Sequence, residues 1–154
     1  MLLTLALLRH GRATGQGTAA GLTPEGEAHL ARLGTRLANE GWRPDAVFTS
    51  PFVRARASAQ LVLERIAPAL DPIVLDELTP ETPPHKAIAA LLAARRNARR
   101  VLAVAHLPLL GLLAEQLTGH DPGFLPGTFV DIELASESSG RLLRRLGPED
   151  LSRP

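Results

Sequence analysis

Short apolar runs of strand length alternate along this chain with longer segments that carry apolar residues at helical spacing. This alternation restricts the possible folds more than any other feature of the sequence. The apolar runs lie at residues 2–8, 45–49, 73–75 and 101–105. Such an order is typical of an α/β domain in which helices cover both faces of a mostly parallel sheet. We therefore expect a three-layer α/β/α sandwich.

The segments between these runs carry the signals of helix starts and stops. Thr23 and Pro24 form a cap followed by a first-turn proline, and Gly41 is a plausible stop. Ser50 and Pro51 repeat the starting pattern. We expect helices over residues 24–39, 51–67, 84–97 and 107–117. A closing antiparallel hairpin is predicted from strands at 128–134 and 141–146, joined by a turn at 136–140.

Length and composition indicate one domain without unusual demands. The chain has 154 residues and a net charge of +1. We expect residues 1–147 to form the domain and residues 148–154 a loose tail. The near-neutral charge gives no reason to expect a nucleic-acid partner. Cysteine is absent, which excludes disulfides and cysteine nucleophiles.

The sequence also predicts a location away from membranes. Its apolar stretches fall well short of the roughly 20 residues that a membrane-spanning helix needs. The apolar start at residues 1–8 has no basic region before it, so it is a poor signal peptide. We expect a cytoplasmic protein.

Histidine and arginine gather where the predicted parallel strands end. Arg9 and His10 follow the first run, Arg54 follows the second, and His106 follows the fourth. Ligands of such sheets bind beyond the carboxyl ends of the strands. Phosphoryl transfer needs a positioned nucleophile and fixed positive charge, which a neutral imidazole and arginine forks can supply. The sequence therefore predicts a phosphate site that needs no metal or other cofactor.

Other readings of single residues are weaker. Ser50 near His106 could suggest a serine hydrolase, but Ser50 lacks a G-x-S-x-G setting and is better explained as a helix cap. The remaining histidines, His29, His85 and His120, are expected to be surface or capping residues, because their spacing does not suit a metal site.

Taken together, the motifs resemble those of the histidine phosphatase superfamily, branch 1, which is phosphoglycerate mutase-like. They are residues 8–11 (LRHG), 22–26 (LTPEG), 49–51 (TSP) with Arg54, and 105–109 (AHLPL). The short length, residues 77–80 and the late segment 124–134 are most similar to the SixA-type phosphohistidine phosphatases. The resemblance implies a phosphoglycerate mutase-like fold. It also implies that His10 is the nucleophile, Arg9 and Arg54 bind phosphate, and His106 contacts the phosphoryl oxygens.

Larger relatives insert a helical cap that supplies a general acid, whereas this chain has only residues 76–84 in that interval. Phosphohistidine needs less help from an acid than an alkyl ester does. We therefore expect a protein-borne phosphohistidine as substrate, and the resemblance suggests a histidine domain of a phosphorelay. Glu77 is the nearest candidate acid, Arg12 is a candidate substrate contact, and Arg56 is expected to be a surface charge.

Two alternatives stay open at this point. One is a broad phosphomonoesterase that uses the same pocket on small phosphate esters. The other is a module that binds phosphorylated proteins without catalysis.

Overall fold

The computed structural model describes residues 3–151, which form a six-stranded sheet with helices on both faces. The strand order is β3-β2-β4-β1-β5-β6. The strands are β1 (Leu3–Arg9), β2 (Ala46–Thr49), β3 (Ile73–Val74), β4 (Arg100–Ala105), β5 (Phe129–Ser136) and β6 (Ser139–Leu146). The helices are α1 (Pro24–Asn39), α2 (Val53–Ile66), the 3₁₀ turn η1 (Asp76–Leu78), α3 (Pro84–Ala94), α4 (Leu109–Thr118) and α5 (Pro148–Leu151).

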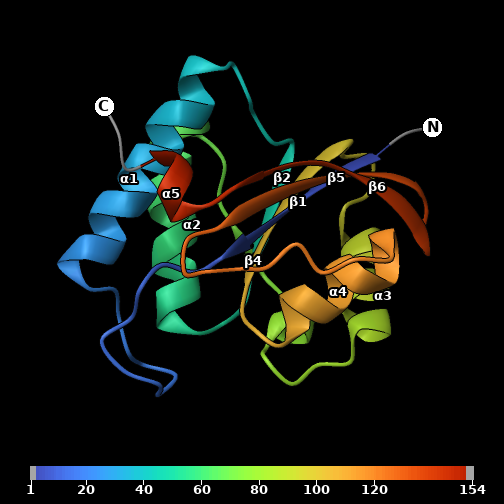
Figure 1. Ribbon diagram of the computed structural model, residues 1–154, viewed down its shortest axis with the longest axis horizontal. Coiled ribbons are helices and arrows are strands. Elements are labelled where there is room, and N and C mark those ends of the chain that lie inside the picture. Colours follow the sequence, from blue (N-terminus) through green and yellow to red (C-terminus); the bar gives the residue numbers. More distant parts are fainter. Residues whose placement is uncertain (1–2, 152–154) are drawn as a thin grey trace.

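The predicted three-layer sandwich is confirmed. In Figure 1, α1 and α2 lie on one face of the sheet, and α3 and α4 lie on the other. Alternate residues of β1 point into the two resulting cores, with Leu5 and Leu7 on the α3–α4 side and Ala6 and Leu8 on the α1–α2 side. All four are nearly inaccessible to solvent, as expected for a strand that is covered on both faces.

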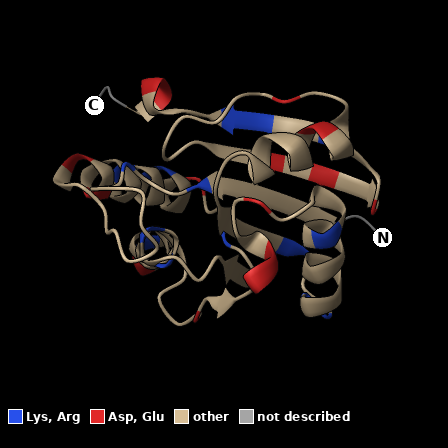
Figure 2. Ribbon diagram, turned by 90° about the horizontal axis from the view of Figure 1, so that it is seen from below, with Lys and Arg blue, Asp and Glu red and all other residues tan. Residues whose placement is uncertain are grey.

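Strands β1 to β4 are parallel to one another, and β5 and β6 add two antiparallel pairings at one side of the sheet. β1 pairs in parallel with β4, while β5 runs antiparallel to both β1 and β6. The predicted C-terminal hairpin is therefore present. No helix within residues 3–151 is long and apolar enough to cross a bilayer. Charged residues gather mainly on the helices and on the hairpin (Figure 2).

The start of α1 follows its predicted signals. The Thr23 hydroxyl accepts a hydrogen bond from the backbone N–H of Gly26 at 3.0 Å, and Pro24 occupies the first turn. The chain then leaves the helix through Gly41, whose φ of 73° suits a residue without a Cβ atom.

Several boundaries differ from the sequence predictions. Helix α2 begins at Val53, with Phe52 at its N-cap, so Ser50 is not the cap of this helix. Helix α4 begins at Leu109 and α3 ends at Ala94. The predicted loose tail is wrong for residues 148–151, which form α5 and bury Leu151 in the core that α1 covers. Residues 152–154 of that predicted tail lie outside the described part of the chain.

Candidate active site

The strand register brings the two predicted site histidines together. β1 and β4 run in parallel with Arg9 opposite Ala105, so His10 and His106 each follow directly at the same edge. The backbone N–H of His10 continues the ladder by donating to the Ala105 carbonyl at 3.1 Å. As a result, the two imidazole rings lie with their centroids 5.0 Å apart.

His10 is held in one orientation, with one nitrogen available. Its Nδ1 lies 2.7 Å from the Gly11 carbonyl. A carbonyl can only accept, so Nδ1 carries the proton in this contact and Nε2 keeps its lone pair. Nε2 in turn lies 3.4 Å from Nε of Arg54, which donates to it. The imidazole therefore presents an unprotonated Nε2 beside a guanidinium.

Both arginines are anchored by backbone carbonyls and not by acids. Arg54 donates to the Gly17 carbonyl at 2.8 Å, and Arg9 donates to the Phe124 carbonyl at 2.9 Å. Within residues 3–151, neither guanidinium makes an ion pair with a carboxylate. The Nε of Arg9 is buried and has no hydrogen-bond partner there. Two uncompensated cations at one spot favour the binding of an anion.

The same environment keeps both histidines neutral. Burial, more than the nearby Arg54 and Arg9, lowers the pKa of His10 to about 4, although its hydrogen bond to Gly11 acts in the opposite direction. Burial, followed by His10 and the arginines, lowers the pKa of His106 to about 3. Burial also lowers the pKa of each arginine, yet a guanidinium stays charged near neutral pH. At pH 7 the site thus combines neutral imidazoles with positive guanidiniums.

His106 is positioned by Ser50 and Phe52. Its Nε2 lies 2.7 Å from the Ser50 hydroxyl oxygen, which also accepts from the Phe52 backbone N–H. The Phe52 ring packs on His106 with centroids 4.6 Å apart, and the Arg54 guanidinium lies 4.9 Å from the same ring. The Nδ1 of His106 is buried without a partner among the described residues. Ser50 therefore serves to orient a histidine.

These groups surround a cavity of about 470 Å³ that opens at the carboxyl edge of the sheet. Its lining includes all four residues predicted with the motifs: Arg9, His10, Arg54 and His106. Arg12 is exposed and lines the mouth of the same cavity. Among the lining residues of the described chain there is no Asp or Glu.

Glu77 and Arg56 are not brought into the cavity. Glu77 lies exposed in η1, and only Pro80, three residues later, reaches the lining. Arg56 is exposed on α2, two residues after Arg54. A surface position was expected for Arg56. Glu77 was the nearest candidate acid in the sequence, and its carboxylate lies outside the cavity lining.

Sequence reasoning missed two supporting residues. Ser58 is buried on α2, donates to the Arg54 carbonyl at 2.7 Å and accepts from the Gly11 backbone N–H at 3.0 Å. His29 was expected to be a surface or capping residue, but it is buried and its Nε2 lies 2.9 Å from the Gly127 carbonyl. The backbone N–H of Gly127 in turn donates to the carbonyls of Arg9 and His10. The sequence signal for Ser58 is its place one helical turn after Arg54.

Comparison with known proteins agrees with this geometry. Residues 5–79 match the family model of the histidine phosphatase superfamily (branch 1). A stretch of 68 residues is 43% identical to a 2,3-bisphosphoglycerate-dependent phosphoglycerate mutase of Thermobifida fusca (strain YX). That match covers 40% of this chain and only 28% of the mutase, so the activity of the whole mutase does not carry over.

Solved structures resemble the chain over nearly its full length. The protein histidine phosphatase SixA in complex with tungstate has a TM-score of 0.88 and 26% identity, covering 97% of this chain and 99% of that one. A SixA protein from Agrobacterium tumefaciens has a TM-score of 0.80 and 23% identity, covering 95% and 99%. The second likeness supports the fold alone. On the family model, the full-length fold and the four converging side chains, this chain belongs to branch 1 of the histidine phosphatase superfamily.

Proposed function

We propose that this chain is a phosphohistidine phosphatase that acts through a phosphoryl group carried on His10. One observation carries the proposal: the cavity gathers two guanidiniums and two neutral imidazoles, but its lining contains no carboxylate in the described chain. The cations suit a phosphoryl group, and the absence of an acid suits a leaving group that needs no enzymatic proton donor.

The first step transfers the phosphoryl group to the protein. The lone pair of His10 Nε2 attacks phosphorus while the bond between phosphorus and the substrate's imidazole nitrogen breaks. The substrate imidazole, already protonated on its other nitrogen, leaves as a neutral ring. Arg9 and Arg54 hold the phosphoryl oxygens through this exchange, and the N–H of Nδ1 donating to Gly11 keeps Nε2 aimed.

The second step returns the enzyme to its starting state. A water oxygen attacks phosphorus and the bond to His10 Nε2 breaks. Both protons of the water leave with the inorganic phosphate, and the imidazole is neutral again with its proton on Nδ1. The low pKa of His10 aids this release, because a less basic nitrogen is a better leaving group. Across both steps one water is consumed, and no metal or redox partner takes part.

The leaving group decides between phosphohistidine and an alkyl ester. An alkoxide is a strong base and leaves only when an acid protonates it. Glu77, the nearest acidic candidate, lies exposed outside the cavity lining. Phosphohistidine avoids this requirement, so it is the substrate class that these side chains fit best.

The test compares turnover across leaving groups. A histidine peptide phosphorylated with phosphoramidate, p-nitrophenyl phosphate and glycerol phosphate are offered to the wild type and to His10→Ala. We expect kcat/KM to be highest for the phosphohistidine peptide and lowest for glycerol phosphate. A preference for the alkyl ester would overturn the proposal in favour of a general phosphomonoesterase. Binding of the phosphopeptide with no turnover of any substrate would instead support a non-catalytic phosphate-binding module.

A further inference from the structure

A second hollow of about 430 Å³ adjoins the phosphate cavity. Arg12 and Pro126 line both hollows, so the two hollows share these side chains. The second hollow extends along α1 to Arg32 and is bounded on its other side by Leu125. A ligand whose phosphoryl group sits against His10 can therefore continue into this hollow without leaving the surface.

The charge of the hollow is unbalanced toward the positive. Arg12 and Arg32 are exposed, and within residues 3–151 the guanidinium of neither makes a hydrogen bond or an ion pair. Glu25 is the single acid in the described lining, and His29 is engaged with the Gly127 carbonyl. Two unpaired guanidiniums thus face one carboxylate. Such a surface complements an acidic partner.

The same hollow has an apolar side. Leu125 is 52% exposed, and two prolines, Pro126 and Pro148, line the hollow with it. Leu107, 36% exposed, adds an apolar side chain to the lining of the phosphate cavity. Exposed apolar side chains next to a binding cavity commonly mark a contact for a partner. The surface therefore offers an apolar contact beside two cationic ones.

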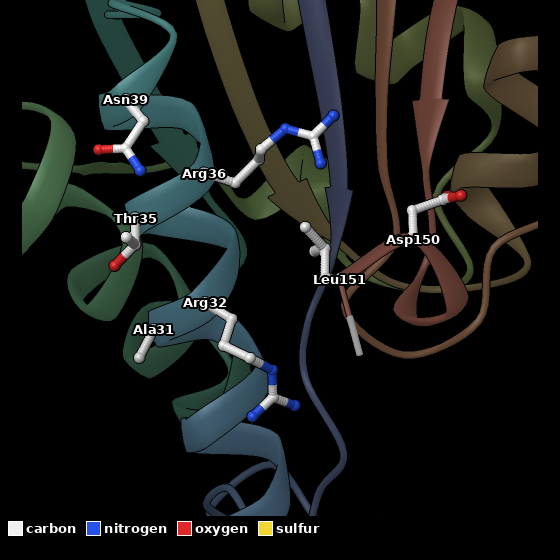
Figure 3. Close-up of a pocket in the computed structure, with 7 residues that line it drawn as sticks. All are labelled: Ala31, Arg32, Thr35, Arg36, Asn39, Asp150 and Leu151. Carbon is white, nitrogen blue, oxygen red and sulfur yellow. The ribbon is translucent and has the colours of Figure 1, made fainter. Parts of the chain in front are cut away.

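Arg32 also borders a further hollow, between α1 and α5. Figure 3 shows Arg32 and Arg36 projecting from the same side of α1. Arg36 is already paired with Glu40 at 2.8 Å. Arg32 is thus the α1 arginine left available to a partner at this place, and it marks the far end of the surface that starts at Arg12.

We propose that the hollow lined by Arg12, Arg32 and Leu125 docks the protein segment that flanks the phosphohistidine, and that this segment carries an acidic and an apolar side chain. This inference rests on the proposed function. The partner is a protein because the hollow lies beside the phosphate cavity and combines charged with apolar contacts. A small phosphate ester has no second group of this kind to place there.

The test uses synthetic peptides with a single histidine, phosphorylated with phosphoramidate. One Asp, next to a Leu, is placed at successive positions from four residues before the phosphohistidine to four residues after it. Matched peptides carry Lys or Ser in place of the Asp, or Ala in place of the Leu. We expect wild-type kcat/KM to favour Asp over Lys at one position by about fivefold, the size of one exposed ion pair. Arg32→Glu should reverse this preference, and Leu125→Ser should weaken the contribution of the peptide's Leu.

The control is Arg43→Glu, which gives the same change in net charge. Arg43 is exposed and lines neither hollow. It should keep the wild-type preference, and all variants should hydrolyse 1-phosphoimidazole at the wild-type rate. Equal turnover of Asp and Lys peptides, or an unchanged preference in Arg32→Glu, would overturn the docking surface while leaving the phosphatase proposal intact. Hydrolysis of esters but of no phosphohistidine peptide would overturn both.

Discussion

The hydroxyl of Ser58 accepts a hydrogen bond from the backbone N–H of Gly11 at 3.0 Å, although 47 residues separate the two in the sequence. Gly11 also accepts from His10 through its carbonyl, and Ser58 donates to the carbonyl of Arg54. Arg54 completes this ring of hydrogen bonds by donating to His10. A single buried hydroxyl thus connects the proposed nucleophile with the arginine that faces it.

Ser58→Ala should therefore impair catalysis by disturbing the position of His10. We expect kcat to fall about tenfold with a smaller change in KM, as for other residues that orient a functional histidine. The Gly11 N–H loses its partner, so stability should also drop by roughly 1–3 kcal/mol. Ser58→Thr keeps the hydroxyl and should recover most of the activity.

A purely structural role for Ser58 would leave the protonation pattern of His10 unchanged. ¹⁵N NMR of the imidazole separates the two cases. The wild type should show the proton on Nδ1, and Ser58→Ala should show a mixture of the two neutral forms. A loss of stability with an unchanged His10 signal and unchanged kcat would contradict the positioning role.

Because His10 and His106 are neutral in the folded protein, the free energy of unfolding should depend on pH. The folded pKa values of His10 and His106, about 4 and about 3, lie below the usual value of about 6.5 for the unfolded chain. The unfolded state therefore takes up protons first as the pH falls, and the free energy of unfolding should decrease between pH 6.5 and about 4. Each histidine should contribute a slope of roughly 1 kcal/mol per pH unit.

Urea unfolding at pH 7, 5.5 and 4.5 measures this slope. His10→Gln should flatten it, whereas His85→Gln, a change at an exposed histidine on α3, should not. A wild-type stability that stays constant from pH 7 to pH 4.5 would show that these histidines are not held neutral by the fold.

Arg54 should be essential in a way that a lysine cannot replace. Its Nε faces His10 while another nitrogen binds Gly17, a fork that an ammonium group cannot reproduce. Arg54→Ala should lower kcat by about 10²–10³, the usual cost of a lost charge-stabilising donor, and Arg54→Lys should recover only part of this. Arg56→Ala, two residues along the same helix, is the matched control. Equal losses at both positions would indicate a general effect on α2.

Glu77→Gln should leave kcat for a phosphohistidine peptide within about twofold of the wild type. The reason is its exposed place in η1, outside the lining of the cavity. Exposed substitutions away from a site usually have small effects. A tenfold or larger loss of kcat, with phosphohistidine and with other leaving groups, would contradict this. It would assign Glu77 the role of general acid.

Much of the fold and the four central side chains follow from local signals. The unbroken apolar runs predict buried parallel strands, and residues that directly follow them, such as His10 and His106, must meet at one edge. The Thr23 and Pro24 pair fixes the start of α1 because its hydrogen bond is local. These features need no knowledge of distant contacts.

The features that the sequence did not predict depend on contacts between segments that lie far apart in the chain. Ser50 has the sequence context of a helix cap, yet its hydroxyl lies beside His106, 56 residues away. His29 is buried because Gly127, 98 residues later, lies against it; a Cβ atom on Gly127 would come within 2.2 Å of the ring. Leu151 is buried in a core that α1 covers. Periodicity and turn signals carry no information about such partners.

The proposed phosphatase reaction depends on a covalent step at His10. The enzyme is mixed rapidly with a ³²P-labelled phosphohistidine peptide, quenched in alkali, and digested to locate the label. We expect acid-labile, alkali-stable label on the peptide that contains His10, with none in His10→Ala. Turnover of the substrate without any label at His10, or equal labelling of His10→Ala, would contradict it.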